Sequence, residues 1–344
     1  MIWHPLTWAF VIAAATGGLL YAMAALRAVE VAAEWQPEYT DARQLRRERR
    51  AENAALLGRW SFGCLWAAAL FGLLGIALIW HRLVPGAMCG TGVLQAMGVG
   101  GGRALIFWAA ALSLLYAWQV LARLDRSDPE APLTVTGARL LITAAPFLVL
   151  ALVSAWQALM HVGSTGPVSC CAVVYDQVLR DAGGGSPMAH LVRPALWLSL
   201  AGSAVLAAMA IAGRRLSNRQ SSIMPVAAAV LWAAASVVAI NHVWSAYYYQ
   251  VLSHPCPWCL FLPQFHSAGF LIFGCLAVVV LESTALSVAD GIRRHHPRLA
   301  PPARRRMRRA AGRILLALAG FTLLTAGPAI LWRLRTGVWL GAAS

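Results

Sequence analysis

Long apolar runs occur eight times along the chain and constrain its fold more than any other feature. Each run is about 20 residues long, which is the length that a helix needs to cross about 30 Å of hydrocarbon. Only 12% of the residues are charged and 60% are hydrophobic, whereas soluble domains carry about 25% charged residues. The sequence therefore predicts an all-α, polytopic membrane helix bundle that forms a single transmembrane domain over 1–344. Its approximate spans are 5–27, 60–80, 104–123, 138–160, 191–213, 223–244, 262–286 and 312–332.

Basic residues indicate how these helices are oriented in the membrane. All 28 of them are arginine, and most lie in alternate connections between the apolar runs. Because cytoplasmic connections carry an excess of basic residues, we expect both termini on the outer, periplasmic side of a bacterial inner membrane. Arginines near an anionic leaflet contribute about 1 kcal/mol each to membrane attachment. We therefore interpret the net charge of +15 as contact with membrane lipid, and we expect no nucleic-acid partner.

Two charged segments are expected on the cytoplasmic side. The segment 28–59 mixes glutamates with arginines and contains Pro37, so we expect a charged arm that includes a surface helix. The segment 289–311 holds eight arginines and three prolines. Because proline interrupts helices, this second segment is expected to be a polybasic loop.

Cysteine and histidine gather on the opposite, outer side of this predicted topology. Five of the seven cysteines fall in outward connections, namely Cys89, Cys170, Cys171, Cys256 and Cys259. Seven of the nine histidines lie at or near the same face, namely His4, His81, His161, His190, His242, His254 and His266. Cys64 and Cys275 fall inside helices, where a small buried thiol usually only packs. The chemistry of the protein is therefore expected at the outer face.

Directly before the seventh apolar run stands the sequence His-Pro-Cys-Pro-Trp-Cys, residues 254–259. Two cysteines with two residues between them can form a disulfide or bind one metal ion. A helix N-terminus stabilises a thiolate because its backbone N–H groups are unpaired, and an outer compartment favours disulfides. We therefore expect Cys256 and Cys259 to exchange a disulfide, with Cys170 and Cys171 as the second set that attacks it. The connectivity stays open, because an odd number of outer thiols leaves one over.

The stretch 255–261 reads Pro-Cys-Pro-Trp-Cys-Leu-Phe and leads into a run that contains Gly269, Phe273 and Gly274. This stretch resembles the reactive helix of the disulfide-bond formation protein B family and of the broader vitamin K epoxide reductase class. The resemblance covers about 20–25 of the 344 residues. Members of this class are membrane oxidoreductases of four or five helices that pass electrons from outer-face cysteines to a quinone.

The resemblance implies roles for individual residues. Cys256 and Cys259 would form the pair next to the quinone, and Cys170 or Cys171 would act as the loop cysteines. Pro263 stands where the best-known members carry a basic residue. The candidates for contact with the quinone are His266, Trp258 and His242. The leading hypothesis is a membrane redox protein that carries out thiol–disulfide exchange at its outer face, linked to a quinone and to an extracytoplasmic thiol or redox protein.

Three other functions fit the same outer residues. The first is a membrane factor that handles copper or zinc, because thiolate and imidazole are ligands of Cu(I) and zinc. Its candidate ligands are His254, Cys256, Cys259, Cys89, Cys170 and Cys171. The second is a subunit of a larger respiratory complex that holds haem b between two axial histidines, drawn from His81, His161, His190 and His242. The third is a structural subunit whose outer disulfides brace long loops.

Overall fold

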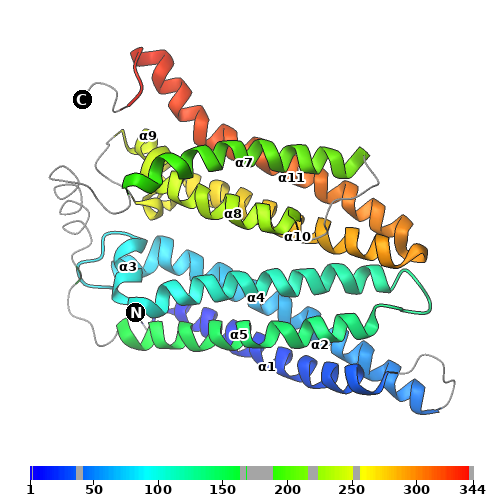
Figure 1. Cartoon of the computed structure of the whole chain (residues 1–344). Helices are drawn as coiled ribbons and strands as arrows, with labels where there is room; N and C mark the ends of the chain where they lie inside the picture. Colours follow the sequence, from blue (N-terminus) through cyan, green and yellow to red (C-terminus); the bar gives the residue numbers. More distant parts are fainter. Residues whose placement is uncertain are drawn as a thin grey trace. The chain divides into compact units, whose positions relative to one another are not determined.

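The computed structural model describes residues 1, 3–35, 42–162, 168, 189–215, 224–250 and 256–340. Within these ranges helix is the only regular secondary structure (Figure 1), which confirms the all-α prediction. Eight helices in the described part of the chain are long and apolar enough to cross a membrane. Each contains one of the eight predicted spans or most of it. The prediction of a multi-pass membrane helix bundle is therefore confirmed.

The eight long helices are accompanied by short helical segments of other types. The long helices are α1 (Pro5–Glu34), α2 (Ala42–Leu74), α4 (Gly98–Asp125), α5 (Thr134–Val162), α7 (Ala189–Arg215), α8 (Met224–Ala239), α10 (Ala268–His295) and α11 (Ala300–Thr336). Two π-helical segments extend α2 and α8, namely η1 (Gly75–Ile79) and η3 (Ile240–Trp244). The remaining short elements are η2 (Trp80–Arg82), α3 (Gly90–Ala96), α9 (Ser245–Tyr249), η4 (Pro257–Phe261), η5 (Pro263–Phe265) and η6 (Pro297–Leu299).

Helix α10 starts later than the apolar run predicts. The run begins at residue 262, but α10 begins at Ala268. Pro263 starts the separate turn η5, and His266 and Ser267 then adopt left-handed φ values of 58° and 52°. Because left-handed residues cannot continue a right-handed helix, hydropathy alone places this helix start too early.

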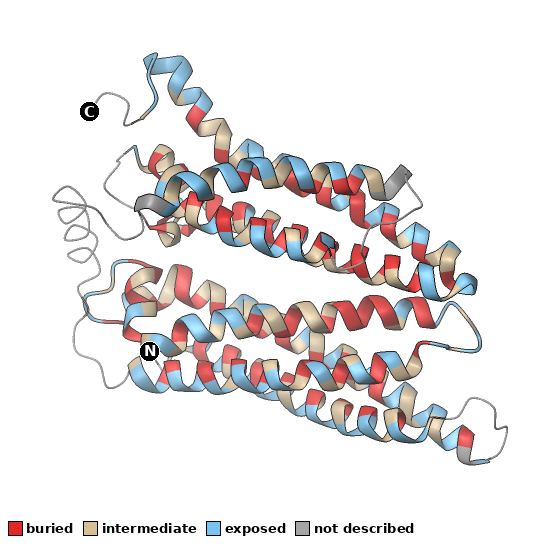
Figure 2. Ribbon diagram, viewed as in Figure 1, coloured by how far each residue is buried: buried red, intermediate tan, exposed pale blue. Residues whose placement is uncertain are grey.

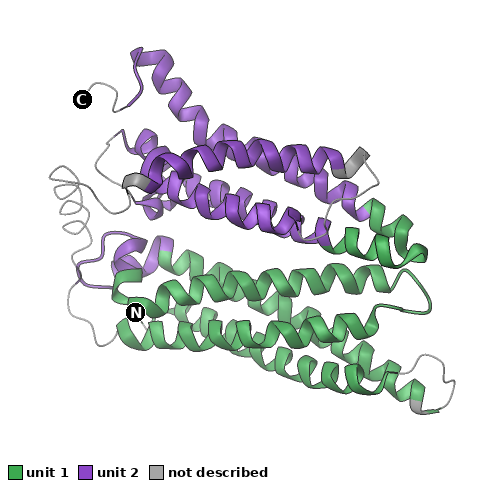
Figure 3. Cartoon of the chain, in the orientation of Figure 1, with its two compact units in different colours: residues 1–76, 94–166, 288–305 green, residues 77–93, 167–287, 306–344 purple. Residues whose placement is uncertain are grey.

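The chain forms two compact units (Figure 3). Unit 1 contains residues 1–76, 94–166 and 288–305, and unit 2 contains residues 77–93, 167–287 and 306–344. In unit 1, α1 packs against α2 and α5, and α4 packs against α5. Gly17 allows α1 to approach α2 closely, because a Cβ there would lie 2.9 Å from Cγ of Leu65. Ser61 donates a hydrogen bond of 2.8 Å to the carbonyl of Gly17. Small and hydroxyl-bearing residues thus hold these helices together, as in other membrane bundles.

Polar contacts also connect the helices of unit 2. The hydroxyls of Ser199 on α7 and Ser236 on α8 lie 2.8 Å apart. Glu282 of α10 is buried, and its carboxylate accepts hydrogen bonds of 2.7 Å from Arg306 and from Arg313, both on α11. A charged group inside a membrane protein is costly unless it is paired. These two arginines therefore make the burial of Glu282 tolerable.

Exposed and buried residues both occur along the long helices (Figure 2), and many of the exposed ones are large and apolar. Leu19 of α1, Ile106 of α4 and Leu316 of α11 are examples of large exposed residues. Apolar surface of this extent is unfavourable in water, but it suits contact with hydrocarbon. The exposed faces of these helices therefore agree with a membrane-spanning bundle.

The secondary structure corrects one of the two predicted charged segments. The prediction that 289–311 is a loop was wrong, because α10 continues to His295 and α11 begins at Ala300. Two of the prolines stand in the first turn of α11. Backbone N–H groups in a first turn make no hydrogen bond within the helix, so the absence of an N–H in proline is tolerated there. The described parts of the segment 28–59 are helical and belong to the end of α1 and the first half of α2, and its role as a charged arm stays a prediction. The cytoplasmic placement of both segments stays a prediction.

Candidate functional site

Three cysteines come together in unit 2. The sulfur atoms of Cys89, Cys256 and Cys259 all lie within 4.8 Å of one another. All three residues are buried, with exposed fractions of 4%, 1% and 8%, and all three are reduced, with no disulfide among the described cysteines. The sequence predicts the pairing of the last two by their spacing. Cys89, which is 167 residues from Cys256, is also one of the candidate metal ligands, but its sequence position gives no specific reason for it to join this pair.

Cys89 is held at the start of a short helix. Its carbonyl accepts backbone hydrogen bonds from Gly92 at 3.0 Å and from Val93 at 3.3 Å, so it begins the first turn of α3. The next residue, Gly90, lies directly against the indole of Trp258, and a Cβ on it would be 2.6 Å from Cδ2 of that ring. A side chain at position 90 would displace this ring. Trp258 itself belongs to the Cys-x-x-Cys segment, between Cys256 and Cys259. This close approach fixes Cys89 against the Cys-x-x-Cys segment.

Cys256 and Cys259 lie on a short 3₁₀ helix rather than on a long one. Cys256 caps η4 in an extended conformation, and Pro257 occupies the first helical position, where its missing N–H costs nothing. The prediction that the pair stands at the N-terminus of the long apolar helix was wrong, because α10 begins only at Ala268. The hydroxyl of Tyr249 donates a hydrogen bond of 2.5 Å to the carbonyl of Cys256. This bond fastens the segment to α9.

Hydrogen bonds within the cluster shift the pKa values of Cys256 and Cys259 in opposite directions. The pKa of Cys256 is lowered, first by hydrogen bonds from Cys259 and Cys89 and also by Thr91, and these outweigh the opposing effect of burial. The sulfurs of Cys89 and Cys256 are 3.4 Å apart, and Oγ1 of Thr91 lies 3.1 Å from the sulfur of Cys256. The pKa of Cys259 is raised, because its thiol is hydrogen-bonded to Cys256 and Cys89 and is buried. The pKa of Cys256 is thus lower than that of Cys259, and Cys256 is the thiol of this pair that loses its proton first.

Aromatic rings enclose the sulfurs. Tyr249, Trp258 and Phe265 are among the partly buried side chains that pack on the cluster. The rings of Tyr249 and Phe265 are 4.5 Å apart and nearly edge to face. Trp258 stacks on Phe261 at 5.4 Å, and Phe261 in turn stacks on Phe273 of α10 at 5.4 Å. This apolar wall keeps water from the thiolate and connects the site to the start of α10.

Of the other predicted site residues that the structure describes, the two histidines do not belong to this buried group. Cys170, Cys171 and His254 lie outside the residues that the structure describes. His266 ends η5 in a left-handed conformation and is exposed. His242 is also exposed, in the π-helical segment η3. The quinone-contact roles of these two histidines stay predictions, whereas Trp258 packs directly on the cysteines.

The histidines proposed as haem ligands are found in different settings. His161 belongs to unit 1, and its Nδ1 lies 2.9 Å from the carbonyl oxygen of Ala96. His81 and His242 belong to unit 2 and lie in η2 and η3. The side chain of His190 lies outside the described part of the structure. The haem alternative therefore stays a hypothesis that rests on the sequence.

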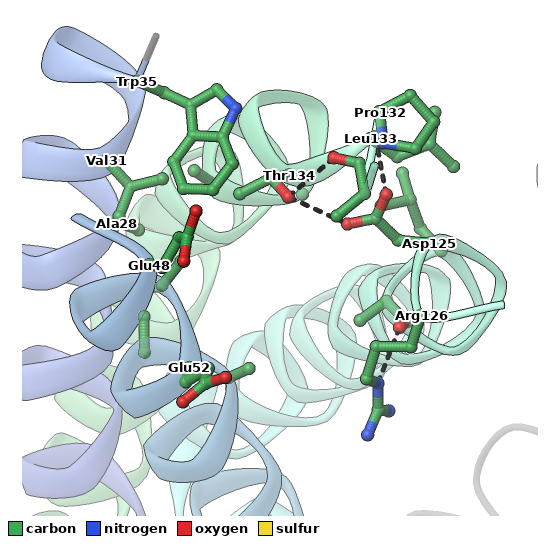
Figure 4. A pocket seen from close by; sticks show the side chains of 18 of the residues that line it. Ala28, Val31, Trp35, Glu48, Glu52, Asp125, Arg126, Pro132, Leu133 and Thr134 are labelled. Carbon is green, nitrogen blue, oxygen red and sulfur yellow. Dashed lines mark hydrogen bonds between the residues drawn. The ribbon is translucent and has the colours of Figure 1, made fainter. Parts of the chain in front are cut away.

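Unit 1 contains a cavity of about 750 Å³ that the sequence does not predict. Its lining comes from α1, α2, α4, α5 and the connection between α4 and α5 (Figure 4). Asp125 shapes this connection, since its carboxylate accepts hydrogen bonds from the N–H of Leu133 at 2.6 Å and the hydroxyl of Thr134 at 3.0 Å. Glu48 and Glu52 also line the cavity. The cavity contains no cysteine, so it is separate in chemistry from the thiol cluster.

Comparison of the chain with protein-family models, with curated proteins and with solved structures finds no match. What the protein does must therefore be argued from its own side chains. The cluster of Cys89, Cys256 and Cys259 is the group of residues best suited to chemistry in the described structure, because it combines a thiol of lowered pKa, two further thiols and an apolar enclosure.

Proposed function

We propose that the protein is a membrane thiol–disulfide oxidoreductase whose reactive centre consists of Cys89, Cys256 and Cys259. The observation that carries the proposal is the distance of 3.4 Å between the sulfurs of Cys89 and Cys256, with Cys259 in the same group. Disulfide exchange proceeds by attack of a thiolate on a disulfide sulfur. Reacting atoms that stand about 3–3.5 Å apart are already in a near-attack arrangement. A third sulfur beside a Cys-x-x-Cys pair supplies the attacking group.

The first step is an exchange inside the cluster that transfers no net electrons. In the oxidised protein a disulfide joins Cys256 to Cys259. The thiolate of Cys89 attacks the sulfur of Cys256, so that a Cys89–Cys256 bond forms and the Cys256–Cys259 bond breaks. Cys259 leaves and takes up the proton that Cys89 has lost. Because the raised pKa of Cys259 makes it a poor leaving group as a thiolate, the proton from Cys89 must reach it as the bond breaks, and the raised pKa then keeps that proton on Cys259.

The second step oxidises a partner that carries two thiols. A thiolate of this extracytoplasmic protein attacks Cys89 and expels Cys256, whose lowered pKa makes it the better leaving group. The partner's second thiol then attacks the mixed disulfide and releases Cys89, and the partner departs with a disulfide. Cys170 and Cys171, argued from sequence alone, are the natural carriers between the partner and Cys89.

A quinone completes the cycle. It accepts two electrons and two protons from the thiols of Cys256 and Cys259, becomes the quinol, and leaves a disulfide between them. Two features support a planar aromatic acceptor at this place. One is the resemblance of the Cys-Pro-Trp-Cys segment to quinone-linked oxidoreductases. The other is the stack of Trp258, Phe261 and Phe273 that extends from the cluster, since aromatic faces stack readily on flat rings.

The proposal places the cluster on the outer side of a bacterial inner membrane, with both termini on that side. The distribution of arginines supports this orientation. Disulfides persist in such oxidising compartments. Membrane lipid surrounds the helices, and the oxidised partner is a protein of the outer compartment.

Counting thiols tests the proposal. The purified protein is reduced, treated with a short-chain quinone, quenched with acid, unfolded and alkylated, and its mass is measured. We expect quinone to remove two alkylatable thiols and reductant to restore them. Cys256→Ser should abolish this change, whereas Cys89→Ser should preserve it and lose only the oxidation of a dithiol protein. Cys64→Ser and Cys275→Ser are the controls. A reversible loss of two thiols in Cys256→Ser would refute the proposal.

A further inference from the structure

The three sulfurs also meet the geometric requirement of a metal site. With a metal–sulfur distance of about 2.3 Å, three thiolates around one ion lie about 3.8–4.0 Å apart. In the structure Cys89 and Cys256 are separated by 3.4 Å, and every sulfur pair in the group lies within 4.8 Å. Displacements of less than about 1 Å would therefore bring all three sulfurs to bonding distance of one ion. Rotamer adjustments of a side chain as short as cysteine cover such a distance.

The donor atoms decide which ion fits. Among the described residues the group contains only cysteines, with no carboxylate or imidazole. Thiolate ligands select soft ions such as Cu(I) and disfavour magnesium, calcium and manganese. Zinc in closed protein sites takes four ligands, whereas Cu(I) is satisfied by three sulfurs. A buried triangle of thiolates is therefore better matched to Cu(I).

The surroundings of the cluster support the same ion. The hydroxyl of Thr91, 3.1 Å from the sulfur of Cys256, donates to the thiolate and orients it, as outer-shell partners do in metal sites. Tyr249, Trp258 and Phe265 pack on the sulfurs and restrict the access of water. An apolar shell of this kind stabilises the lower oxidation state of copper, because it disfavours the more highly charged ion.

We propose that the fully reduced cluster binds one Cu(I) ion through Cys89, Cys256 and Cys259, and that formation of a disulfide among them abolishes the site. A disulfide abolishes the site because it removes two of the three ligands. This second part rests on the proposed function, which supplies the disulfide. Binding itself does not require that the protein exchange disulfides. The oxidation state of the cluster would then decide whether the protein holds copper or reacts with thiols.

A competition titration tests this inference. The protein is reduced with a phosphine, freed of reductant, and titrated without oxygen with Cu(I) in the presence of a chromophoric Cu(I) chelator. We expect it to withdraw one equivalent from the chelator. Oxidation with diamide beforehand should prevent the withdrawal, as should serine at Cys89, Cys256 or Cys259. Serine at Cys64 or Cys275 should leave it unchanged. Circular dichroism and gel filtration confirm that each variant is folded.

The outcomes separate the two proposals. A protein that withdraws no copper, or that still withdraws one equivalent when Cys89 is replaced by serine, overturns the copper site. Withdrawal that persists after complete oxidation overturns the control by disulfide formation. A protein that binds one copper ion but shows no quinone-dependent loss of thiols contradicts the exchange function alone. The opposite result contradicts the copper site alone.

Discussion

Removal of the Thr91 hydroxyl tests the electrostatics of the cluster most directly. Thr91→Val keeps the shape of the side chain and deletes the hydrogen bond of 3.1 Å to the sulfur of Cys256. A hydrogen bond to a charged group contributes about 1.5–3 kcal/mol, and one pKa unit corresponds to about 1.4 kcal/mol. Because the bond stabilises the thiolate and not the thiol, its loss should raise the pKa of Cys256 by about one to two pH units.

The ultraviolet absorbance of the thiolate measures this change. It is recorded against pH for the reduced protein, as the difference from the Cys256→Ser variant. Thr91→Ser keeps a hydroxyl and should titrate like the wild type, and Thr143→Val removes a hydroxyl from α5, far from the cysteines in sequence. If Thr91→Val titrates like the wild type, or if Thr91→Ser shifts as far as Thr91→Val, the assignment of Thr91 as a donor to the thiolate is wrong.

The same thiolate makes stability depend on pH in a defined direction. The pKa of Cys256 is lower in the folded protein than in the unfolded chain, so the unfolded chain binds the proton first as the pH falls. The stabilisation is fully present above the ordinary thiol pKa of about 8.5 and is lost as the pH falls towards the lowered value. Urea unfolding of the reduced protein should show this slope, and the slope should be weaker in Cys256→Ser.

Two further pairs of substitutions test the packing of unit 2. Glu282→Gln removes the carboxylate that pairs with Arg306, whose side chain is only 18% exposed, so we expect the free energy of unfolding to fall by about 3 kcal/mol. Arg313→Gln removes a side chain that is 61% exposed and should lower the free energy of unfolding by less than about 1 kcal/mol. Equal losses in thermal unfolding for both would contradict the pairing. Gly90→Ala places a Cβ 2.6 Å from an indole carbon and should cost about 1–3 kcal/mol, with altered tryptophan fluorescence. Gly274→Ala meets no atom within 4 Å and should be neutral or slightly stabilising, so similar effects of the two glycine variants would argue against the close approach.

The membrane spans could be predicted because hydropathy reports the requirement that defines them. The runs 104–123 and 138–160 lie inside α4 (Gly98–Asp125) and α5 (Thr134–Val162), which begin several residues before them and end two residues after them. Hydropathy marks the portion of a helix that fits hydrocarbon, and the helix itself continues until its backbone bonding ends. The prediction of a loop over 289–311 was wrong because it treats the prolines there as helix breakers, although proline is tolerated in the first turn of a helix.

The thiol site could be predicted only in part. The spacing of Cys256 and Cys259 identifies a pair, because local sequence determines their separation. The predicted topology places Cys89 on the same side as this pair, but its close approach depends on how distant segments fold together, which the spacing of residues does not determine. One indirect signal was present, namely glycine after Cys89 and tryptophan between the other two cysteines, but only the structure shows that Gly90 and Trp258 touch. The hydroxyl of Tyr249 was missed because tyrosine at a membrane boundary usually serves as an interfacial anchor.

The ion pairs of Glu282 have a consequence for biogenesis. A helix that enters the bilayer with an unpaired carboxylate meets a cost of about 2.5–3.5 kcal/mol at the translocon. The compensating arginines follow 24 and 31 residues later in the chain, so they emerge from the ribosome only after α10 is complete. Insertion of α10 and α11 together as a hairpin is therefore favoured over insertion of α10 alone, because only the pair compensates Glu282.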